Sequence, residues 1–199
     1  MTATVFMLSP LGGKDLSDWC TSYPKKKGRK PVKVPTTDLP KKKGDPATVM
    51  EDGVTLHDMV QNFLKNNNDD LVLFAHSRGC TVVGEWLAIW SNEISDDDAK
   101  RISIILTGNL ERKHFGFIAK KPSWMDSGSS TRTTPENTRF KILDIGRKGD
   151  LWANYPGGVL AWPLLFVCLP HLNYFNIDPE NLKPISEKVV GNTRYVNVK

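Results

Sequence analysis

The sequence lacks the features of disulfide-rich, secreted and membrane-spanning proteins. Its three cysteines, Cys20, Cys80 and Cys168, are odd in number and not closely spaced, so they allow one bridge but indicate no disulfide framework. The first residues contain no basic stretch followed by a long apolar one, which argues against a secretory signal. The longest apolar run, 159–169, is interrupted by Pro163 and is too short to cross a bilayer. We therefore expect a soluble protein without a secretion signal.

The sequence also has little excess charge outside one segment. Hydrophobic residues make up 39% and charged residues 25% of the 199 residues, as in soluble globular proteins, and the length fits one domain over residues 1–199. The net charge is +5 and the pI about 9.1, and most of the excess lies between Lys25 and Lys43, which contains two Lys-Lys-Lys runs. The excess positive charge is thus a property of this segment and not of the whole protein.

We interpret residues 25–43 as a basic loop insertion in contact with solvent. Its prolines would confine a strand at 32–34 to the edge of a sheet. The alternative is a landing surface for an anionic partner, such as nucleic acid, an acidic glycan or phospholipid. Apart from Tyr23, no aromatic residues alternate with these charges, which makes nucleic acid an unlikely partner.

Apolar runs separated by helical patterns predict an α/β fold with a mainly parallel sheet. No internal repeat is visible, and residues 110–139 have weak periodicity, so they are expected to form a long loop or partial cap. The expected strands are 4–8, the run that begins at Leu71, 102–106 and 140–145. The expected helices are 54–65 with Asp52-Gly53 as its start, one from Gly79 to about Ser91, and a short one near 16–20.

The stretch Ala75-His76-Ser77-Arg78-Gly79 carries the strongest chemical signal. It follows a buried strand and precedes a helix, like the nucleophile elbow G-x-S-x-G with alanine in the place of the first glycine. Such a corner lifts the serine hydroxyl above the carboxyl edge of the sheet. Residues 75 and 79 must be small because a larger side chain would collide with the crossing backbone. Ser77 is therefore a candidate nucleophile.

A serine hydroxyl becomes a good nucleophile only when an oriented base removes its proton. In this fold the acid and the histidine follow the serine in chain order. The sequence contains four histidines, of which His57 precedes the serine and His76 adjoins it as an expected packing residue. His114 comes early after the third strand, whereas His171 comes late, after a proline, in a position suited to a loop that reaches back over the sheet.

Two aspartates qualify as the acid on this reasoning. Asp144 is expected at the end of a strand, and Asp150 lies slightly further on in Gly149-Asp150-Leu151-Trp152. Strand ends and the turns just after them are both suitable places for the acid, so the choice between the two stays open.

Taken together, these segments resemble cutinases. Gly149–Trp152 and Pro170–Tyr174 look like the acid segment G-D-x-[VI]-C and the histidine segment A-H-x-x-Y, and the elbow matches G-Y-S-Q-G in spacing. Ala75, Arg78 and Trp152 differ from that pattern, and Trp152 replaces the family's cysteine. Residues 107–112 and 150–156 are also similar to the PE/PPE-associated serine esterase domain of mycobacteria.

The resemblance, which covers most of residues 71–176, implies a cutinase-like α/β-hydrolase: a three-layer sandwich without a large lid. It implies a cofactor-free and metal-free serine esterase that cleaves lipidic or cell-envelope esters through an acyl-enzyme. Ser77 would be the nucleophile, His171 the base and Asp150 the orienting acid, with oxyanion donors at the Arg78 N–H and Ser9. Residues 159–169, with Trp162 and Phe166, could form an acyl-chain wall.

Relatives of this kind occur in actinobacteria and their phages, including lysins that cleave mycolic-acid esters. The resemblance therefore implies a location in the cytoplasm or in a phage virion, with release on lysis. The alternative function is a non-catalytic or weakly active virion tail component, which contacts phage structural proteins and the host envelope.

Overall fold

The computed structural model describes residues 2–10, 22–37, 47–121, 132–158, 169–174 and 176–199. The short helix expected near 16–20 and the expected acyl-chain wall with Trp162 and Phe166 lie outside these residues. The basic segment 25–43 is described only as far as residue 37.

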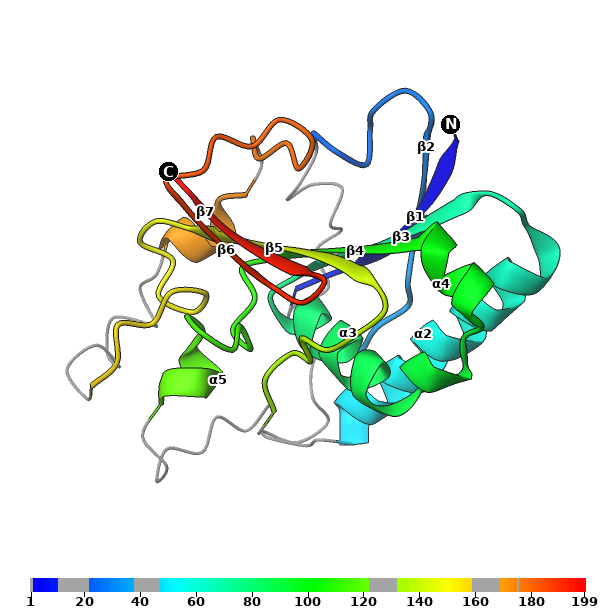
Figure 1. The fold of residues 1–199 in the computed structure, drawn as a ribbon, viewed down its shortest axis with the longest axis horizontal. Helices are drawn as coiled ribbons and strands as arrows, with labels where there is room; N and C mark the ends of the chain where they lie inside the picture. Colours follow the sequence, from blue (N-terminus) through cyan, green and yellow to red (C-terminus); the bar gives the residue numbers. More distant parts are fainter. Residues whose placement is uncertain (1, 11–21, 38–46, 122–131, 159–168, 175) are drawn as a thin grey trace.

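A seven-stranded sheet runs through the middle of the molecule in the order β2-β1-β3-β4-β5-β7-β6 (Figure 1). All neighbouring strands pair in parallel except β6, which is antiparallel to β7. The central strands are nearly continuous apolar runs because layers cover both faces. The strands are β1 (Ala3–Leu8), β2 (Arg29–Lys33), β3 (Asp70–His76), β4 (Ile102–Thr107), β5 (Lys141–Arg147), β6 (Ser186–Val190) and β7 (Thr193–Val198).

Helices cover one face of the sheet, and irregular segments cover the other (Figure 1). The larger core cluster lies between the sheet and α2 and α3, with Trp86 and Phe63 among its members. On the opposite face, Tyr23 and Tyr174 pack against the sheet. The helices are α2 (Ala47–Asn66), α3 (Arg78–Ile89), α4 (Asp96–Arg101) and α5 (Phe117–Lys120), with 3-10 turns η1 (Ser91–Glu93) and η4 (Leu169–Leu172). No helix of the described residues is long and apolar enough to cross a membrane.

The prediction that Asp52-Gly53 starts a helix is wrong. The helix α2 begins at Ala47, so both residues lie inside it. Asp52 faces the interior, where it pairs with Arg78 and accepts hydrogen bonds from Thr37. Gly53 leaves room for a ring, because a Cβ there would come within 2.8 Å of Trp90. Both residues therefore contribute to the packing of α2 against neighbouring elements and do not cap its N-terminus.

The two segments expected as a basic loop, 25–43, and as a long loop or partial cap, 110–139, contain short regular elements where they are described. Part of the basic segment is β2, an edge strand as its prolines suggest, and Lys26 pairs with Asp178 and Glu180. Some of that charge is thus neutralised within the protein. The 110–139 segment carries the short helix α5, whose Phe117 packs on Tyr155.

Candidate active site

Ser77 occupies a sharp corner between β3 and α3. Its φ of 52° and ψ of −118° make it the one non-glycine residue of the described chain with a positive φ. Such backbone strain is typical of functional positions. A Cβ on Gly79 would collide with the carbonyl oxygen of Leu8, and Ala75 is fully buried beside the same strand. The close approach of Leu8 agrees with the predicted need for a small residue at Gly79, and for Ala75 that need stays a prediction.

The structure brings Ser77, His171 and Asp150 together from three separate segments. His171 lies in η4, and its Nε2 is 2.8 Å from Ser77 Oγ. Its Nδ1 is 3.1 Å from both carboxylate oxygens of Asp150, which lies in the turn after β5. The exposed fraction is 0% for Asp150 and 8% for His171, so water is largely excluded from the link between them. The imidazole thus bridges a hydroxyl and a buried carboxylate.

Further donors hold the Asp150 carboxylate in place. Oδ1 accepts the backbone N–H groups of Trp152 and Ala153 at 3.0 and 3.2 Å, and Oδ2 accepts the Tyr174 hydroxyl at 2.7 Å. Burial opposes ionisation, but the hydrogen bonds with His171, Tyr174 and Ala153 outweigh it and lower the pKa of Asp150 below its ordinary value. Burial raises the pKa of Tyr174 well above 10, so this hydroxyl remains a donor. Asp150 is therefore an anion that faces His171.

The fold of the chain is similar to that of a protein of known structure. No protein-family model matches the chain, and no curated protein sequence does. A solved structure described as a cutinase-like protein from Cryptococcus sp. matches 87% of this chain and 86% of that chain, with a TM-score of 0.57 and 15% sequence identity. The chain has a cutinase-like α/β-hydrolase fold. This confirms the predicted fold class, whereas the similarity to the PE/PPE domain and the phage origin stay predictions.

Within this cutinase-like fold, Asp144 does not reach His171. It lies inside β5 and not at its end, because the strand continues to Arg147. Its carboxylate contacts Arg112 Nε at 2.9 Å and the Asn109 amide at 2.8 Å, and both Asp144 and Arg112 are fully buried. Of the two aspartates left open by the sequence, the structure thus brings Asp150 to the histidine.

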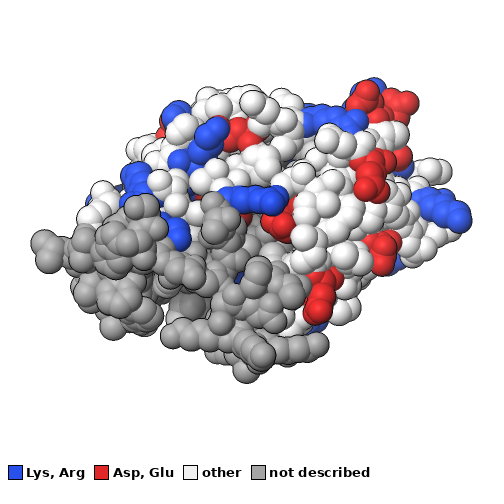
Figure 2. Space-filling model, turned by 90° about the horizontal axis from the view of Figure 1, so that it is seen from below, with Lys and Arg blue, Asp and Glu red and all other residues white. Residues whose placement is uncertain are grey.

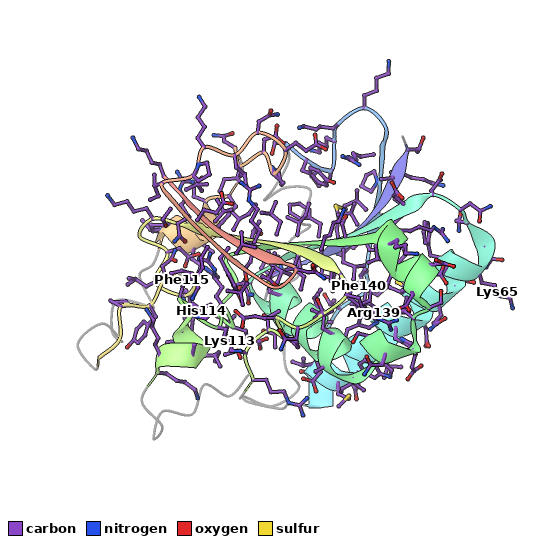
Figure 3. The ribbon with its side chains drawn as sticks, in the orientation of Figure 1. Lys65, Lys113, His114, Phe115, Arg139 and Phe140 are labelled. Carbon is purple, nitrogen blue, oxygen red and sulfur yellow. The ribbon has the colours of Figure 1, made fainter. Side chains whose placement is uncertain are left out.

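Two of the remaining histidines lie elsewhere. His114 Nε2 contacts Glu136 at 2.7 Å, next to Lys113 and Phe115 (Figure 3). His57 lies on α2, where it stacks on Trp90. Neither contacts Ser77 in the described part of the chain. No group of three or more His, Cys, Asp and Glu side chains suited to hold a metal ion occurs among the described residues either.

His76 packs against the candidate base. Its ring centroid is 5.2 Å from that of His171 and 5.1 Å from that of Tyr174. Its Nδ1 is 3.0 Å from the Thr107 carbonyl oxygen, which can only accept, so Nδ1 carries the proton. Burial, followed by the proximity of His171, lowers the pKa of His76 to about 3. The predicted packing residue is thus a neutral ring beside His171.

The buried His76 should make the protein sensitive to acid. Its folded pKa of about 3 lies below the ordinary 6.5, so the unfolded chain binds the extra proton between these values and stability falls as pH falls. We expect His76 to lower the free energy of unfolding by about 2 kcal/mol when the pH falls from 7 to 5. Urea unfolding of the wild type and of His76→Asn at both pH values measures the effect.

Asparagine is a suitable replacement because its amide can still donate to the Thr107 carbonyl while it cannot titrate. The variant will lose some packing at both pH values. The test therefore compares the difference in free energy of unfolding between wild type and variant at pH 7 with the same difference at pH 5. That difference should shrink by about 2 kcal/mol from pH 7 to pH 5. An unchanged difference would mean that His76 does not titrate as its burial requires.

The two predicted oxyanion residues adjoin the elbow. Arg78 begins α3, and its guanidinium pairs with Asp52 of α2 at 2.6 Å, with both side chains largely buried. The charge that the sequence places next to Ser77 is thus neutralised from α2. Ser9 follows β1, whose Leu8 touches Gly79, and its hydroxyl is buried without a hydrogen-bond partner among the described residues.

Three residues that hold the candidate site were not predicted for that role. Tyr174 belongs to the histidine segment, and its position three residues after His171, just beyond η4, is a signal that could have indicated a shared partner. Asp52 and Arg112 give no such signal, because each meets its partner only through packing of distant segments.

Proposed function

We propose that the protein is a serine esterase that hydrolyses carboxylic esters through Ser77, His171 and Asp150. The observation that carries the proposal is the continuous contact from Ser77 Oγ to His171 Nε2 at 2.8 Å and from His171 Nδ1 to the Asp150 carboxylate at 3.1 Å. A hydroxyl, an imidazole and a buried carboxylate in this order are the parts that acyl transfer requires. The cutinase-like fold supports the proposal, because in such folds the acid and the histidine follow the serine in chain order, as Asp150 and His171 follow Ser77 here.

The proposed reaction has two acyl-transfer steps. Ser77 Oγ attacks the ester carbonyl while His171 Nε2 takes its proton, and His171 then gives this proton to the leaving alcohol. The ester C–O bond breaks and leaves an acyl group on Ser77. Water, deprotonated by His171, attacks that acyl group and releases the acid, which restores the Ser77 hydroxyl. Asp150 stays ionised and stabilises the imidazolium in both steps.

The proposed oxyanion donors are the Arg78 backbone N–H and the Ser9 hydroxyl. A buried hydroxyl without a partner usually carries a desolvation cost, and a transient oxyanion would supply the missing acceptor. Pro10, the next residue, has no N–H to offer. The Asp52–Arg78 pair supports the role of Arg78, because it fixes the residue that carries the other donor.

For the substrate we propose esters of lipidic or cell-envelope acids. Exposed apolar side chains on the turn that carries His171 support this proposal, with Leu169 74% and Leu172 45% exposed. Such side chains could contact an acyl chain at the site. An origin in an actinobacterium or its phage, a cytoplasmic or virion location, contacts of the virion with phage proteins, and an anionic partner for 25–43 stay predictions.

A fluorophosphonate probe tests the proposal, because it phosphonylates a serine only where a base activates it. The wild type should be labelled at Ser77, as read by peptide mass spectrometry, and should hydrolyse a short p-nitrophenyl ester. Ser77→Ala should do neither. Ser9→Ala is the matched control, since it keeps the nucleophile: it should still be labelled while its kcat falls about 10²–10³-fold.

Labelling of Ser77→Ala at another serine would exclude the proposed nucleophile. No labelling and no turnover by the wild type would contradict the esterase and favour a non-catalytic role of the same fold. Equal turnover by Ser9→Ala and the wild type would remove Ser9 from the oxyanion site.

A further inference from the structure

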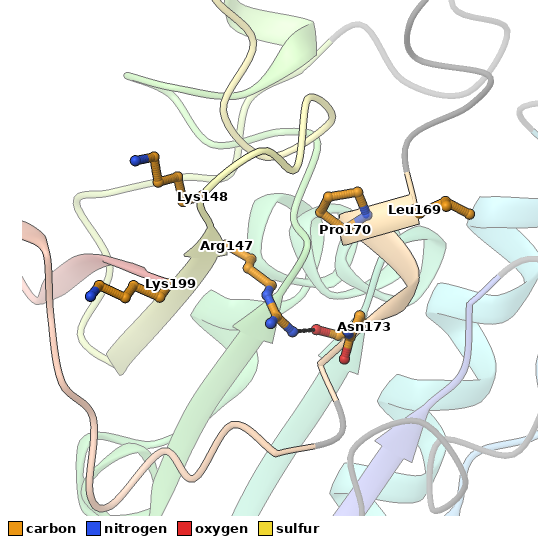
Figure 4. A pocket seen from close by; sticks show the side chains of 6 residues that line it. All are labelled: Arg147, Lys148, Leu169, Pro170, Asn173 and Lys199. Carbon is orange, nitrogen blue, oxygen red and sulfur yellow. Dashed lines mark hydrogen bonds between the residues drawn. The ribbon is translucent and has the colours of Figure 1, made fainter.

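A cleft of about 380 Å³ lies outside the candidate active site, against the turn that carries His171 (Figure 4). Three of its lining residues are cationic, and none is acidic. Leu169, Pro170 and Asn173 complete the lining from η4 and the residue that follows it. The lining residues are Arg147, Lys148, Leu169, Pro170, Asn173 and Lys199.

The three cations are held together by the end of the sheet. Arg147 is the last residue of β5 and lies opposite Val198 of β7. The Lys148 N–H donates to the Val198 carbonyl at 2.7 Å, which brings Lys148 next to Lys199. Like charges in one hollow repel, so their arrangement favours a bound anion.

Arg147 differs from the other arginines in its partners. Seven of the eight arginines in the sequence form an ion pair with a carboxylate, namely Arg29, Arg78, Arg101, Arg112, Arg132, Arg139 and Arg194. Arg147 has no such partner among the described residues. One of its guanidinium N–H groups donates to the carbonyl of Asn173 (Figure 4). That bond orients the guanidinium plane and leaves further donors of its fork for an oxyanion.

Figure 2 shows one face of the molecule, seen from below, on which the acidic side chains lie mostly on the right and several Lys and Arg side chains lie on the left. Among the residues that line the cleft itself, no acidic side chain opposes an approaching anion.

We propose that the cleft binds a phosphate group. The oxygens of a phosphate can pair with the guanidinium of Arg147 and with the two ammonium groups at once, which a single carboxylate does less well. Such a phosphate group can belong to a free phosphate ion or to the headgroup of an anionic lipid. The exposed Leu169 at the rim suits the lipid source, because it can meet acyl chains beside the headgroup.

A hydrogen bond from the backbone of Arg147 connects the cleft to the candidate triad. The Arg147 N–H donates to the Tyr174 hydroxyl at 2.9 Å, and this hydroxyl donates to Asp150. The bound phosphate would thus lie next to residues that position the acid. Binding is measured without turnover, so the proposal can fail or hold independently of the esterase.

The test compares three proteins in two assays. The cleft variant is Lys148→Glu/Lys199→Glu, and the matched control is Lys65→Glu/Lys141→Glu, which changes net charge equally. Lys141 begins β5 at the opposite end from Arg147, and Lys65 lies at the far side of the molecule (Figure 3). The first assay is the shift in melting temperature with inorganic phosphate against chloride at equal ionic strength. The second is co-sedimentation with phosphatidylglycerol or phosphatidylcholine vesicles.

We expect phosphate to raise the melting temperature of the wild type and the control but not of the cleft variant. We also expect the cleft variant to bind phosphatidylglycerol vesicles at least about tenfold more weakly than the control. Stabilisation by phosphate without vesicle binding supports the free anion as ligand, and vesicle binding that only the cleft variant loses supports the headgroup. Equal losses in both variants, or no response to either ligand, would overturn the proposal. Lys148→Gln/Lys199→Gln replaces the cleft variant should the glutamates impair folding.

Discussion

Replacing Asp150 with asparagine should lower kcat for ester hydrolysis about 10⁴-fold without unfolding the protein. The side chain keeps its size, and its oxygen can still accept the N–H groups of Trp152 and Ala153. Initial rates at saturating p-nitrophenyl ester measure the effect, and near-ultraviolet circular dichroism checks the fold. A loss smaller than tenfold would remove Asp150 from the proposed mechanism.

The expected loss arises from the tautomer of His171. Because the two backbone N–H groups hold an oxygen at the Oδ1 position, the amide nitrogen of the asparagine takes the position of Oδ2 and faces His171 Nδ1. A donor at that position favours the tautomer with the proton on Nε2. Nε2 then cannot accept the proton of Ser77, and the charge that would stabilise the imidazolium is also missing.

The variant Tyr174→Phe distinguishes the effect of the Asp150 charge on kcat from the effect of how the carboxylate is positioned. The change removes one of the donors to the carboxylate and leaves the Arg147 N–H without the hydroxyl that accepts it. The carboxylate itself and its contact with His171 remain, so kcat should fall only about tenfold. A loss as large as that of Asp150→Asn would mean that geometry, and not charge, dominates the role of the acid.

The strands that the sequence predicted are those buried by layers on both faces. β1, β3 and β4 are nearly continuous apolar runs, and β5 contains Ile142, Leu143 and Ile145, so composition marks all four. β6 and β7 were missed because β6 is mostly exposed and β7 mixes polar with apolar residues. β6 is the edge strand of the sheet and β7 lies between it and β5, so their pairing with neighbouring strands specifies them more than a signal of their own.

The sequence predicted which residues of the candidate site follow one another along the chain, but not the contacts between them. The elbow around Ser77 and the late His171 are recognisable because this fold constrains their order along the chain. The choice between Asp144 and Asp150 required the length of β5, which continues to Arg147 and leaves Asp144 inside the strand. The neutralisation of Arg78 by Asp52 also depends on how α2 packs against α3, which no local pattern encodes.

Replacing Arg112 with methionine should lower the free energy of unfolding by about 3–5 kcal/mol. The guanidinium is fully buried, and besides its contact with Asp144 it donates to acceptors in three segments. Methionine fills much of the volume but provides no donor, so these acceptors lose their partner. The acceptors are the side chains of Asn154 and Asn197 and the carbonyls of Asp144, Ala153 and Val196.

The loss should grow with pH. Burial raises the pKa of Asp144 from 3.8 to about 6, although Arg112 and Asn109 favour the ionised form. Without the guanidinium this folded pKa should rise further. Folding then takes up a proton above pH 6, and stability falls by up to about 1.4 kcal/mol for each pH unit until the new folded pKa is passed. Urea unfolding at pH 5 and pH 8 should therefore show a larger gap to the wild type at pH 8.

The double variant Arg112→Met/Asp144→Asn shows whether the pH-dependent part comes from Asp144. It lacks the titrating group, so it should be more stable than Arg112→Met at pH 8, and its gap to the wild type should not grow above pH 6. Identical pH profiles of the single and double variants would contradict this charge pairing. Because Arg112 also holds Ala153 and Asn154, just after Asp150, the folded fraction of both variants should have a reduced kcat. Asp144 would then support the proposed acid through Arg112 without contacting His171.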